Sequence, residues 1–446
     1  MGYKKKIHQL GVVGDSMRKR ILVRGPALSR SGYGEQTRFA LRALRHHEDK
    51  FDIFLNTTSW GATSWITEDN EERQWIDNLL QKTISHVQSG GSFDVSLQVT
   101  IPGEFEQVAP VNIGYTAGIE TTKISTQWLE KTYLMNKIIV PSEHAKSAFE
   151  TTSFKARNPE GQIVDVGCIT PVEAVSFPAK FVPAEELDIS LDTPFNFLNV
   201  AQLSPRKNFD NCLRWFVEEF HDDADVGLVV KINLAKNCLL DRRATQERLT
   251  HFLSEYPDRK CKVYLLHGSL SDGQMSSLYS KDTIKAIVST THGEGFGLPL
   301  FEAVQAELPV VAPNWSGHKD FLYMPVPEKG KKSKKTKSRP MFAKVDYQLK
   351  PVQPEAVWQN VIIPESMWCF PKERSFKNAL RSLYKDDGLA RSQAKKLRAH
   401  IEKTLASETQ YDAFVRAMGL SFQASSASVE DLLGTGASES DIEVHS

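Results

Sequence analysis

The stretch from His292 to Glu302 constrains the fold of this chain more than any other, because it joins an apolar strand to an apolar helix through a glycine-rich turn. Residues 284–289 are rich in β-branched side chains and are typical of a central parallel strand. Glycines in the turn let backbone N–H groups approach a ligand closely. A helix is predicted to begin at Leu298. The sequence therefore predicts a ligand-binding turn at a helix N-terminus.

The residues of this turn indicate what it binds. Unpaired N–H groups and the helix dipole favour phosphate or another anion at the start of the helix. Glu294 lies in the turn, and Glu302 lies eight residues later, just inside the helix. Two carboxylates beside an anion site are repulsive unless each accepts hydrogen bonds from neutral groups. We therefore expect sugar and ribose hydroxyls as their partners.

The whole pattern, Glu-Gly-Phe-Gly-Leu-Pro-Leu-Phe-Glu followed by Leu-Pro-Val-Val-Ala at 308–312, resembles the donor-site signature of retaining glycosyltransferases of family four. The resemblance implies an α/β protein of the GT-B fold, with two Rossmann-like, doubly wound parallel-sheet domains facing a cleft. It implies an enzyme of class EC 2.4 that moves a hexose or pentose from a nucleoside-diphosphate sugar, with UDP or GDP as the nucleotide, to a hydroxyl acceptor. The resemblance implies that the anomeric configuration is retained. It implies no metal ion and no cofactor.

The resemblance also assigns donor-binding residues. Glu302 is expected to bind the ribose hydroxyls, while Glu294 and the N–H groups of Phe296 and Gly297 hold the sugar and the phosphate. A glycine turn after a first strand at 21–23 is expected to face the diphosphate from the other domain. The remaining donor-binding residues implied by the match are Gly295, Leu298, Gly32, Tyr33 and Gly34.

A second loop, Gln202-Leu-Ser-Pro-Arg-Lys-Asn208, follows a strand predicted at 195–200 and carries two cations. Two cations at a strand-to-helix turn are suited to neutralise a diphosphate, arginine by a fork and lysine as a point charge. The loop resembles a Pro-Arg-Lys-Asn variant in the family, so Arg206 and Lys207 join Glu294 as the predicted catalytic residues. Some relatives have an arginine where this chain has Gln202, which leaves open which cation contributes most.

A third candidate region follows the strand predicted at 111–115. Many relatives place a histidine that touches the donor sugar at this strand end, and this chain has none there. Thr116, Glu120 or Thr121 is expected to contact the sugar or the acceptor instead. The alternative is that these residues cap the following helix.

Two further motifs are interpreted as structural. Asp223-Ala-Asp225 matches the metal-binding Asp-x-Asp of another glycosyltransferase fold, but these acids precede the strand at 226–230. A ligand site on a parallel sheet is expected at the carboxyl end of a strand, so no metal is predicted here. His267 follows the strand at 263–266, where a nucleotide base often rests in such folds, yet a hydrogen-bonded structural histidine is the preferred interpretation.

At 446 residues the chain is too long for a single core. The domain boundary is expected near 172–192, and residues 161–183 are expected to belong to a linker. The predicted parts are a leader at 1–18, an acceptor domain at 19–180, a donor domain at 193–372, terminal helices crossing back at 373–420, and a disordered tail at 421–446.

The composition excludes several classes of protein. A net charge of zero excludes a globally basic nucleic-acid footprint. Five scattered cysteines, none in a Cys-x-x-Cys pair, indicate neither a disulfide framework nor a zinc site. The sequence contains no run of about 18 apolar residues, so no transmembrane helix is predicted. We therefore expect a cytoplasmic protein, which would lie in the host cytoplasm if a phage encodes it.

The acceptor is the least determined feature. The segment Lys329 to Arg339 carries seven cations and is either an exposed loop or a contact for a polyanion, nucleic acid above all. The chain is also similar to glycosyltransferases of tailed phages, some of which modify hydroxymethylated DNA bases. The sequence therefore leaves a glycan, a lipid or modified DNA as the acceptor. The alternative from another class is a non-catalytic nucleotide-sugar or glycan-binding protein.

Overall fold

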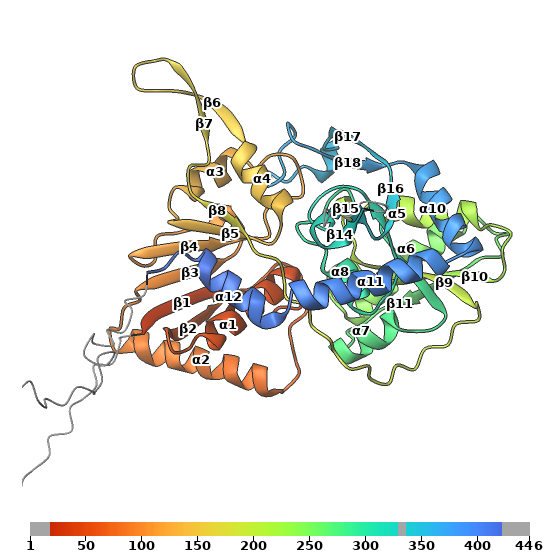
Figure 1. Cartoon of the computed structure of the whole chain (residues 1–446), viewed down its shortest axis with the longest axis horizontal. Helices are drawn as coiled ribbons and strands as arrows, with labels where there is room; N and C mark the ends of the chain where they lie inside the picture. The colour runs from red at the N-terminus through yellow and green to blue at the C-terminus, as the bar shows by residue number, and fades with distance from the viewer. Residues whose placement is uncertain (1–17, 329–335, 422–446) are drawn as a thin grey trace, which may run out of the picture.

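The computed structural model describes residues 18–328 and 336–421. The predicted leader up to residue 17, most of the lysine-rich segment (329–335) and the predicted tail from residue 422 lie outside the described residues. The described chain forms two lobes side by side, with the N-terminal half in one and most of the C-terminal half in the other (Figure 1).

The first lobe is built on a six-stranded sheet in the order β2-β1-β3-β4-β5-β8. Each neighbouring pair of these strands is parallel. All residues of β3 are buried, as expected for a parallel strand that is covered on both faces. The strands are β1 (Lys19–Gly25), β2 (Phe51–Thr57), β3 (Val95–Val99), β4 (Val111–Tyr115), β5 (Lys137–Val140) and β8 (Val172–Ala174), and the helices are α1 (Gly32–His46), α2 (Glu71–Gln88), α3 (Thr126–Thr132) and α4 (Glu143–Thr151).

The second lobe repeats this design with a six-stranded parallel sheet in the order β11-β10-β9-β12-β13-β16. The predicted α/β class with two Rossmann-like parallel sheets is thus confirmed. The strands are β9 (Phe195–Gln202), β10 (Val226–Asn233), β11 (Lys262–Leu266), β12 (Ile284–Val288), β13 (Val310–Pro313) and β16 (Ala343–Val345), and the helices are α5 (Phe209–Glu219), α6 (Leu239–Leu253), α7 (Asp272–Tyr279), α8 (Leu298–Gln305) and α9 (Lys319–Leu322).

The strand order places the two loops of interest next to each other. From β9 the chain proceeds to β10 on one side, and β12 returns to pair with β9 on the other. Such a reversal leaves room for a ligand at the carboxyl ends of the two central strands. The loop with the two cations follows β9, and the glycine-rich turn follows β12. Both predicted donor loops therefore lie at the switch point of the second sheet.

One expectation about the connection between the lobes is wrong. Residues 161–169 were expected to belong to a linker, but β6 (Ser153–Arg157) and β7 (Ile163–Gly167) form an antiparallel hairpin that projects from the first lobe (Figure 1). Asn158 closes its turn by accepting hydrogen bonds from the backbone of Gly161 and Gln162. Most side chains of both strands are exposed, so they lack the alternation of buried and polar residues that marks a strand.

Aromatic side chains join the lobes through the connecting segment. Phe177, which follows β8, lies between Phe39 of α1 and Phe296 of the glycine-rich turn, with ring centroids 5.6 Å and 5.0 Å away. All three side chains are buried in one hydrophobic cluster. The connection is therefore part of the core.

The C-terminal segment also spans both lobes. After α10 (Glu373–Lys385), α11 (Gly388–Thr404) runs across the second lobe, and α12 (Ser407–Ala417) lies against α1 (Figure 1). The hairpin of β17 (Tyr347–Pro351) and β18 (Met367–Pro371) reaches the first lobe, where Met367 exchanges hydrogen bonds of 2.9 and 3.0 Å with Thr122. A second hairpin pairs β14 (Tyr323–Pro327) with β15 (Thr336–Pro340). None of the helices in the described part of the chain is long and apolar enough to cross a membrane.

Candidate functional site

The glycine-rich turn of the second lobe is pressed against the first lobe. Ser142, which caps α4, donates a hydrogen bond of 2.6 Å to the carbonyl of Gly295. A Cβ atom on Gly295 would lie only 2.6 Å from the carbonyl oxygen of Ala117, so glycine is needed for this approach. Gly297 then precedes α8, which begins at Leu298 as predicted. The turn is thus held between the two sheets.

Glu294 of this turn is paired with both predicted cations. Its carboxylate accepts hydrogen bonds from Lys207 Nζ at 2.7 Å and from Arg206 Nη1 at 3.0 Å. The residue is only 7% exposed. Burial raises the pKa of the Glu294 carboxyl, but Lys207 and Arg206 outweigh burial and lower it to about 2. Glu294 is therefore charged at neutral pH, and the three predicted catalytic residues form one cluster.

Arg206 carries this cluster across to the first lobe. Its Nη1 also donates to the carbonyl of Gly293 at 2.7 Å, and its Nε lies 3.2 Å from a carboxylate oxygen of Glu120. Glu120 follows β4, so an acid from the first sheet reaches the cations of the second. Of the three residues predicted at this strand end, Glu120 is the one that joins the cluster.

The other two residues at this strand end have partners elsewhere. Thr116 is fully buried, and its hydroxyl lies 2.9 Å from the hydroxyl of Tyr33. Thr121 is also fully buried and donates to the carbonyl of Lys123 at 3.1 Å. Thr116 therefore positions Tyr33 of the predicted glycine turn, whose ring lies 4.0 Å from that of Trp60.

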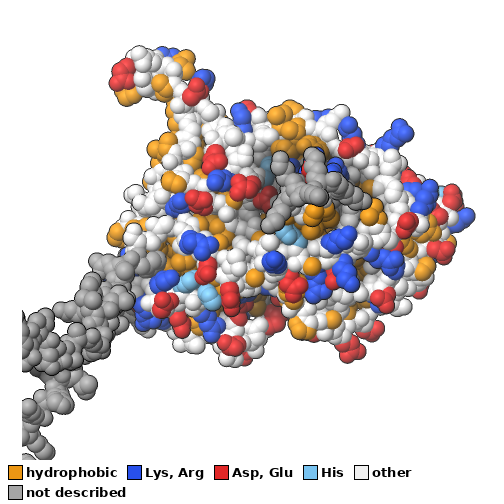
Figure 2. Space-filling view, viewed as in Figure 1, with side chains coloured by type: hydrophobic (Ala, Val, Ile, Leu, Met, Phe, Trp, Pro, Cys, Tyr) orange, Lys and Arg blue, Asp and Glu red, His pale blue; other side chains and the backbone are white. Residues whose placement is uncertain are grey.

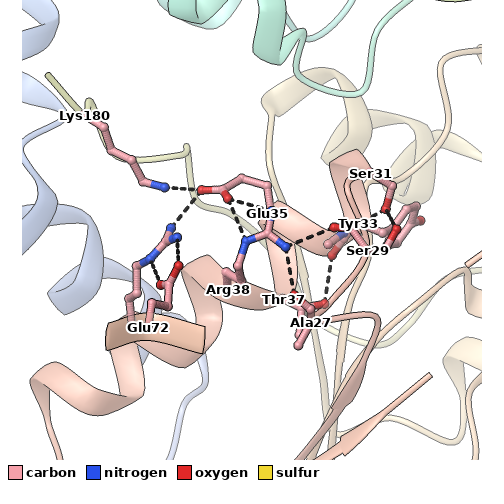
Figure 3. Close-up of polar contacts among 11 residues, drawn as sticks. Ala27, Ser29, Ser31, Tyr33, Glu35, Thr37, Arg38, Glu72 and Lys180 are labelled. Atoms are coloured by element: carbon pink, nitrogen blue, oxygen red, sulfur yellow. Dashed lines mark hydrogen bonds and ion pairs between the residues drawn. The ribbon is translucent and has the colours of Figure 1, made fainter. Parts of the chain in front are cut away.

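The Gly32 to Gly34 turn at the start of α1 is anchored from two sides (Figure 3). Ser31 caps the helix by accepting a hydrogen bond of 3.0 Å from the Gly34 N–H. Arg38 donates to the carbonyls of Ala27 at 2.8 Å and Ser29 at 3.0 Å, and so fixes the loop that leads into the turn. The turn is therefore pre-organised by its own helix.

A partly buried carboxylate next to this turn connects it to the segment between the lobes. Glu35 pairs with Arg38 and Lys180, as Figure 3 shows, and it also pairs with Arg42. Burial raises the pKa of Glu35, but these three cations outweigh burial and lower it well below its usual range. The backbone N–H of Lys180 donates to Gln305 of α8 at 2.5 Å. Lys180 thus links α1 to the helix that follows the glycine-rich turn.

Glu302, the predicted ribose ligand, also lies on α8. Its carboxylate accepts a hydrogen bond of 2.9 Å from Tyr279 of α7. The residue as a whole is exposed to solvent. Desolvation by the protein next to its carboxyl group, with smaller contributions from Asp272 and Glu35, raises the pKa of Glu302 to about 7. Its charge therefore changes near neutral pH, unlike that of Glu294.

Sequence reasoning missed a cation at the same end of the second sheet. Lys231 lies near the end of β10 and donates to the carbonyl of Gly268 at 2.7 Å. Burial, with Arg30 nearby, lowers the pKa of Lys231 to about 8. Arg30 of the first lobe donates to the carbonyl of Leu270 at 3.3 Å. A lysine that interrupts an apolar strand, in Val-Val-Lys-Ile, is a signal that could have revealed this residue.

The residues interpreted as structural have protein partners. His267 lies 2.9 Å from Asp241 and its side chain is 2% exposed. Asp223 pairs with Arg381 of α10 at 2.9 Å. Neither residue contacts the cluster around Glu294 in a contact that the structure describes.

Comparison with known proteins identifies the second lobe. Residues 189–324 match the family model described as glycosyl transferases group 1. The serotype-specific mannosyltransferase WbdA of Escherichia coli is 29% identical over 138 residues, which cover 30% of this chain and 16% of that protein. The matched region contains Arg206, Lys207, Glu294 and Glu302. The predicted family of glycosyltransferases is therefore confirmed for this region.

Solved structures support the fold over most of the chain. A sucrose-phosphate synthase from Thermosynechococcus elongatus has a TM-score of 0.57 at 13% identity, covering 90% of this chain and 98% of that one. Anabaena HepE, solved in complex with UDP-glucose, has a TM-score of 0.54 at 12% identity, covering 90% of this chain and 100% of that one. Together with the two parallel sheets, these likenesses confirm the predicted GT-B architecture.

Proposed function

We propose that this chain, whose residues 189–324 form a group 1 glycosyltransferase domain, moves a hexose or pentose from a nucleoside-diphosphate sugar to a hydroxyl acceptor. The proposal includes retention of the anomeric configuration and a reaction that needs no metal ion or cofactor. The observation that carries it is the cluster of Glu294, Arg206 and Lys207 at the switch point of the second sheet. This is where a doubly wound sheet binds its ligand.

The donor is proposed to lie along the carboxyl ends of β9 and β12. Glu302 accepts hydrogen bonds from the ribose hydroxyls, with Tyr279 fixing the orientation of its carboxylate. The N–H groups at the start of α8, from Phe296 to Leu298, face the phosphate and the sugar. The Gly32 to Gly34 turn of the first lobe approaches the diphosphate from the opposite side. The nucleotide is UDP or GDP.

Catalysis is proposed to rest on stabilising the leaving group. As the bond between the anomeric carbon and the diphosphate oxygen breaks, negative charge grows on the diphosphate. Arg206 and Lys207 offset this charge and so lower the barrier. The acceptor oxygen forms its bond to the anomeric carbon on the same face, and its proton passes to the departing phosphate oxygen. Two cations supply the positive charge that a metal ion supplies in other enzymes.

Glu294 is proposed to hold the cations in place before the donor arrives. In the described structure its carboxylate pairs with both of them, and Glu120 forms a further ion pair with Arg206. A diphosphate competes with these carboxylates for the same N–H groups. Binding of the donor therefore frees oxygens of Glu294 for hydroxyls of the sugar.

Modified DNA is the second candidate acceptor, and the observation that favours it is the lysine-rich segment from 329 to 339. Lys337 and Arg339 lie on β15 and are exposed, while residues 329–335 lie outside the described residues. Several cations in one segment suit several phosphates. A glycan or lipid acceptor, and a non-catalytic nucleotide-sugar or glycan-binding protein, are the remaining alternatives.

The experiment that tests the function measures release of nucleoside diphosphate from a panel of UDP-, GDP- and ADP-sugars. Each donor is assayed with and without duplex DNA that carries hydroxymethylated bases. Turnover that does not depend on DNA supports the main proposal and names the donor. Strong stimulation by the modified DNA supports the second candidate. No release from any donor, with nucleotide still bound, would favour the non-catalytic alternative.

A further inference from the structure

A groove of about 650 Å³ lies between the lobes, next to the cluster of Glu294 and its cations. One wall is α4 of the first lobe, and the other is the segment from Trp315 to Tyr323 of the second lobe. Glu143 and Asp320 connect the walls, because the Glu143 N–H donates a hydrogen bond of 2.8 Å to the Asp320 carboxylate.

The inner end of the groove reaches the proposed reaction site. Ser316 lines the groove, and its hydroxyl accepts a hydrogen bond of 2.8 Å from the backbone N–H of Glu294. Thr121, which lines the opposite wall, directly follows Glu120, the acid that contacts Arg206. A molecule in this groove would therefore point its inner end towards the residues proposed to act on the donor.

The chemistry of the lining fits a carbohydrate. Many of its side chains carry hydroxyl groups, and Trp315 adds an aromatic ring of the kind that packs on the C–H face of a sugar. The ring of His144 lies edge-on to that of Trp315, with centroids 4.9 Å apart. Among the described residues, His144 Nε2 and Trp315 Nε1 are buried without a hydrogen-bond partner.

The charges of the groove do not suit a polyanion. Two carboxylates, Glu143 and Asp320, line it with one lysine, Lys319. Burial, together with His318 and Lys319 nearby, lowers the pKa of His144 to about 4, so this ring is neutral at neutral pH. A nucleic-acid site instead gathers cations along its phosphates.

We propose that the groove between α4 and the Trp315 to Tyr323 segment binds a sugar unit of the acceptor. This inference rests on the proposed glycosyltransferase function and names its acceptor class as a glycan or a glycosylated molecule. Asp320 and Trp315 recognise the sugar, Asp320 through hydroxyl groups and Trp315 through one face of the ring. Neither residue takes part in binding the nucleotide.

The test uses the full chain and methyl glycosides of common hexoses as probes, with binding followed by ligand-observed NMR. Ser147 of α4 lines the groove and is exposed, so Ser147→Trp fills it. Ser382 of α10 lines a separate groove of about 630 Å³ on the second lobe and is also exposed, so Ser382→Trp is the matched control. Binding of UDP and GDP to each protein is measured by calorimetry.

At least one methyl glycoside is expected to bind the wild-type chain, and Ser147→Trp is expected to weaken this binding at least tenfold. Ser382→Trp should retain it, and both variants should bind nucleotide as the wild type does. Glycoside binding that persists in Ser147→Trp, or no glycoside binding to the wild type, overturns the proposal. Binding of hydroxymethylated DNA that Ser147→Trp abolishes overturns it in favour of DNA. If glycosides bind in the groove but no nucleotide binds anywhere, the glycosyltransferase function fails while the sugar site stands.

Discussion

Lys207 Nζ lies 2.7 Å from Glu294 Oε1, so the cation expected to bind the diphosphate neutralises the acid expected to hold the sugar. Arg206 occupies the other carboxylate oxygen at 3.0 Å. The sequence predicts that these three side chains share a site, but not that they are paired with one another before a donor is present. Their pairing explains how a buried carboxylate and two largely buried cations are tolerated together.

Replacing Glu294 with alanine is expected to destabilise the fold by about 3 kcal/mol, because it leaves two largely buried cations without their carboxylate. The free energy of unfolding in urea gives the measurement. The double variant Glu294→Gln with Lys207→Met, which removes one charge of each sign, should regain part of this loss. Equal stability of Glu294→Ala and the wild type would show that the ion pairs contribute nothing.

The variants Arg206→Ala and Lys207→Ala are each expected to lower kcat roughly 100-fold, because each removes a charge that stabilises the leaving diphosphate. Steady-state release of nucleoside diphosphate provides the measurement, and circular dichroism checks the fold. Arg243→Ala serves as the control, since Arg243 is an exposed cation on α6. Unchanged kcat in both site variants would remove them from the catalytic site.

Affinity for the donor is expected to rise as the pH increases through about 7, the raised pKa of Glu302. Below this pH the carboxyl group is protonated and is a poorer acceptor for ribose hydroxyls. Above it the carboxylate accepts hydrogen bonds from both ribose hydroxyls. The donor Kd, measured over one pH unit on either side of that value, should fall severalfold. In Glu302→Gln the affinity should be low and independent of pH, and a pH dependence that survives this substitution would assign it to another group.

Two neighbours of Glu302 should shift this pH profile in opposite directions. Lys180 lowers the pKa of Glu302 and Asp272 raises it. Lys180→Met should therefore move the profile to higher pH, and Asp272→Asn should move it to lower pH. Both curves come from the same titration of donor affinity. Shifts in the same direction would show that these residues act on the fold rather than on the charge of Glu302.

The glycine turn of the first lobe offers a matched pair of substitutions. A Cβ atom at Gly34 would lie 1.9 Å from the carbonyl oxygen of Ser29, whereas a Cβ atom at Gly32 would meet nothing within 4 Å. Gly34→Ala should lower stability by more than about 2 kcal/mol and raise the donor KM. Gly32→Ala should be neutral or slightly stabilising, because alanine restricts the unfolded chain. Thermal unfolding measures the stability of both variants. Equal losses of stability in the two would contradict the described turn.

Local sequence patterns predicted the parts of the fold that depend on neighbours in the chain. The apolar run at 284–289, the glycines and the helix from Leu298 are all found. The two cations after β9 were placed correctly beside the glycine-rich turn, because parallel strands bring their carboxyl ends to one edge.

Contacts between distant segments could not be predicted in this way. Glu120 of the first lobe forms an ion pair with Arg206 of the second, and Arg30 of the first lobe lies near Lys231 of the second. The spacing of residues along the sequence does not predict such contacts, because they depend on how the two lobes pack. The groove beside Trp315 needs walls from both lobes and has no local signal. The β6–β7 hairpin was missed because its strands bury little apolar surface and so lack a periodic pattern.

The position of Phe177 between Phe39 and Phe296 bears on how such proteins can be recombined. An engineer who grafts the second lobe of a relative onto this first lobe would cut near that phenylalanine and inherit one of its two neighbours from each parent. A chimera with mismatched side chains at these three positions would carry a void or a clash directly behind the glycine-rich turn. A hybrid protein should therefore take all three phenylalanine positions from one parent. The glycine-rich turn would then keep the packing that holds it in place.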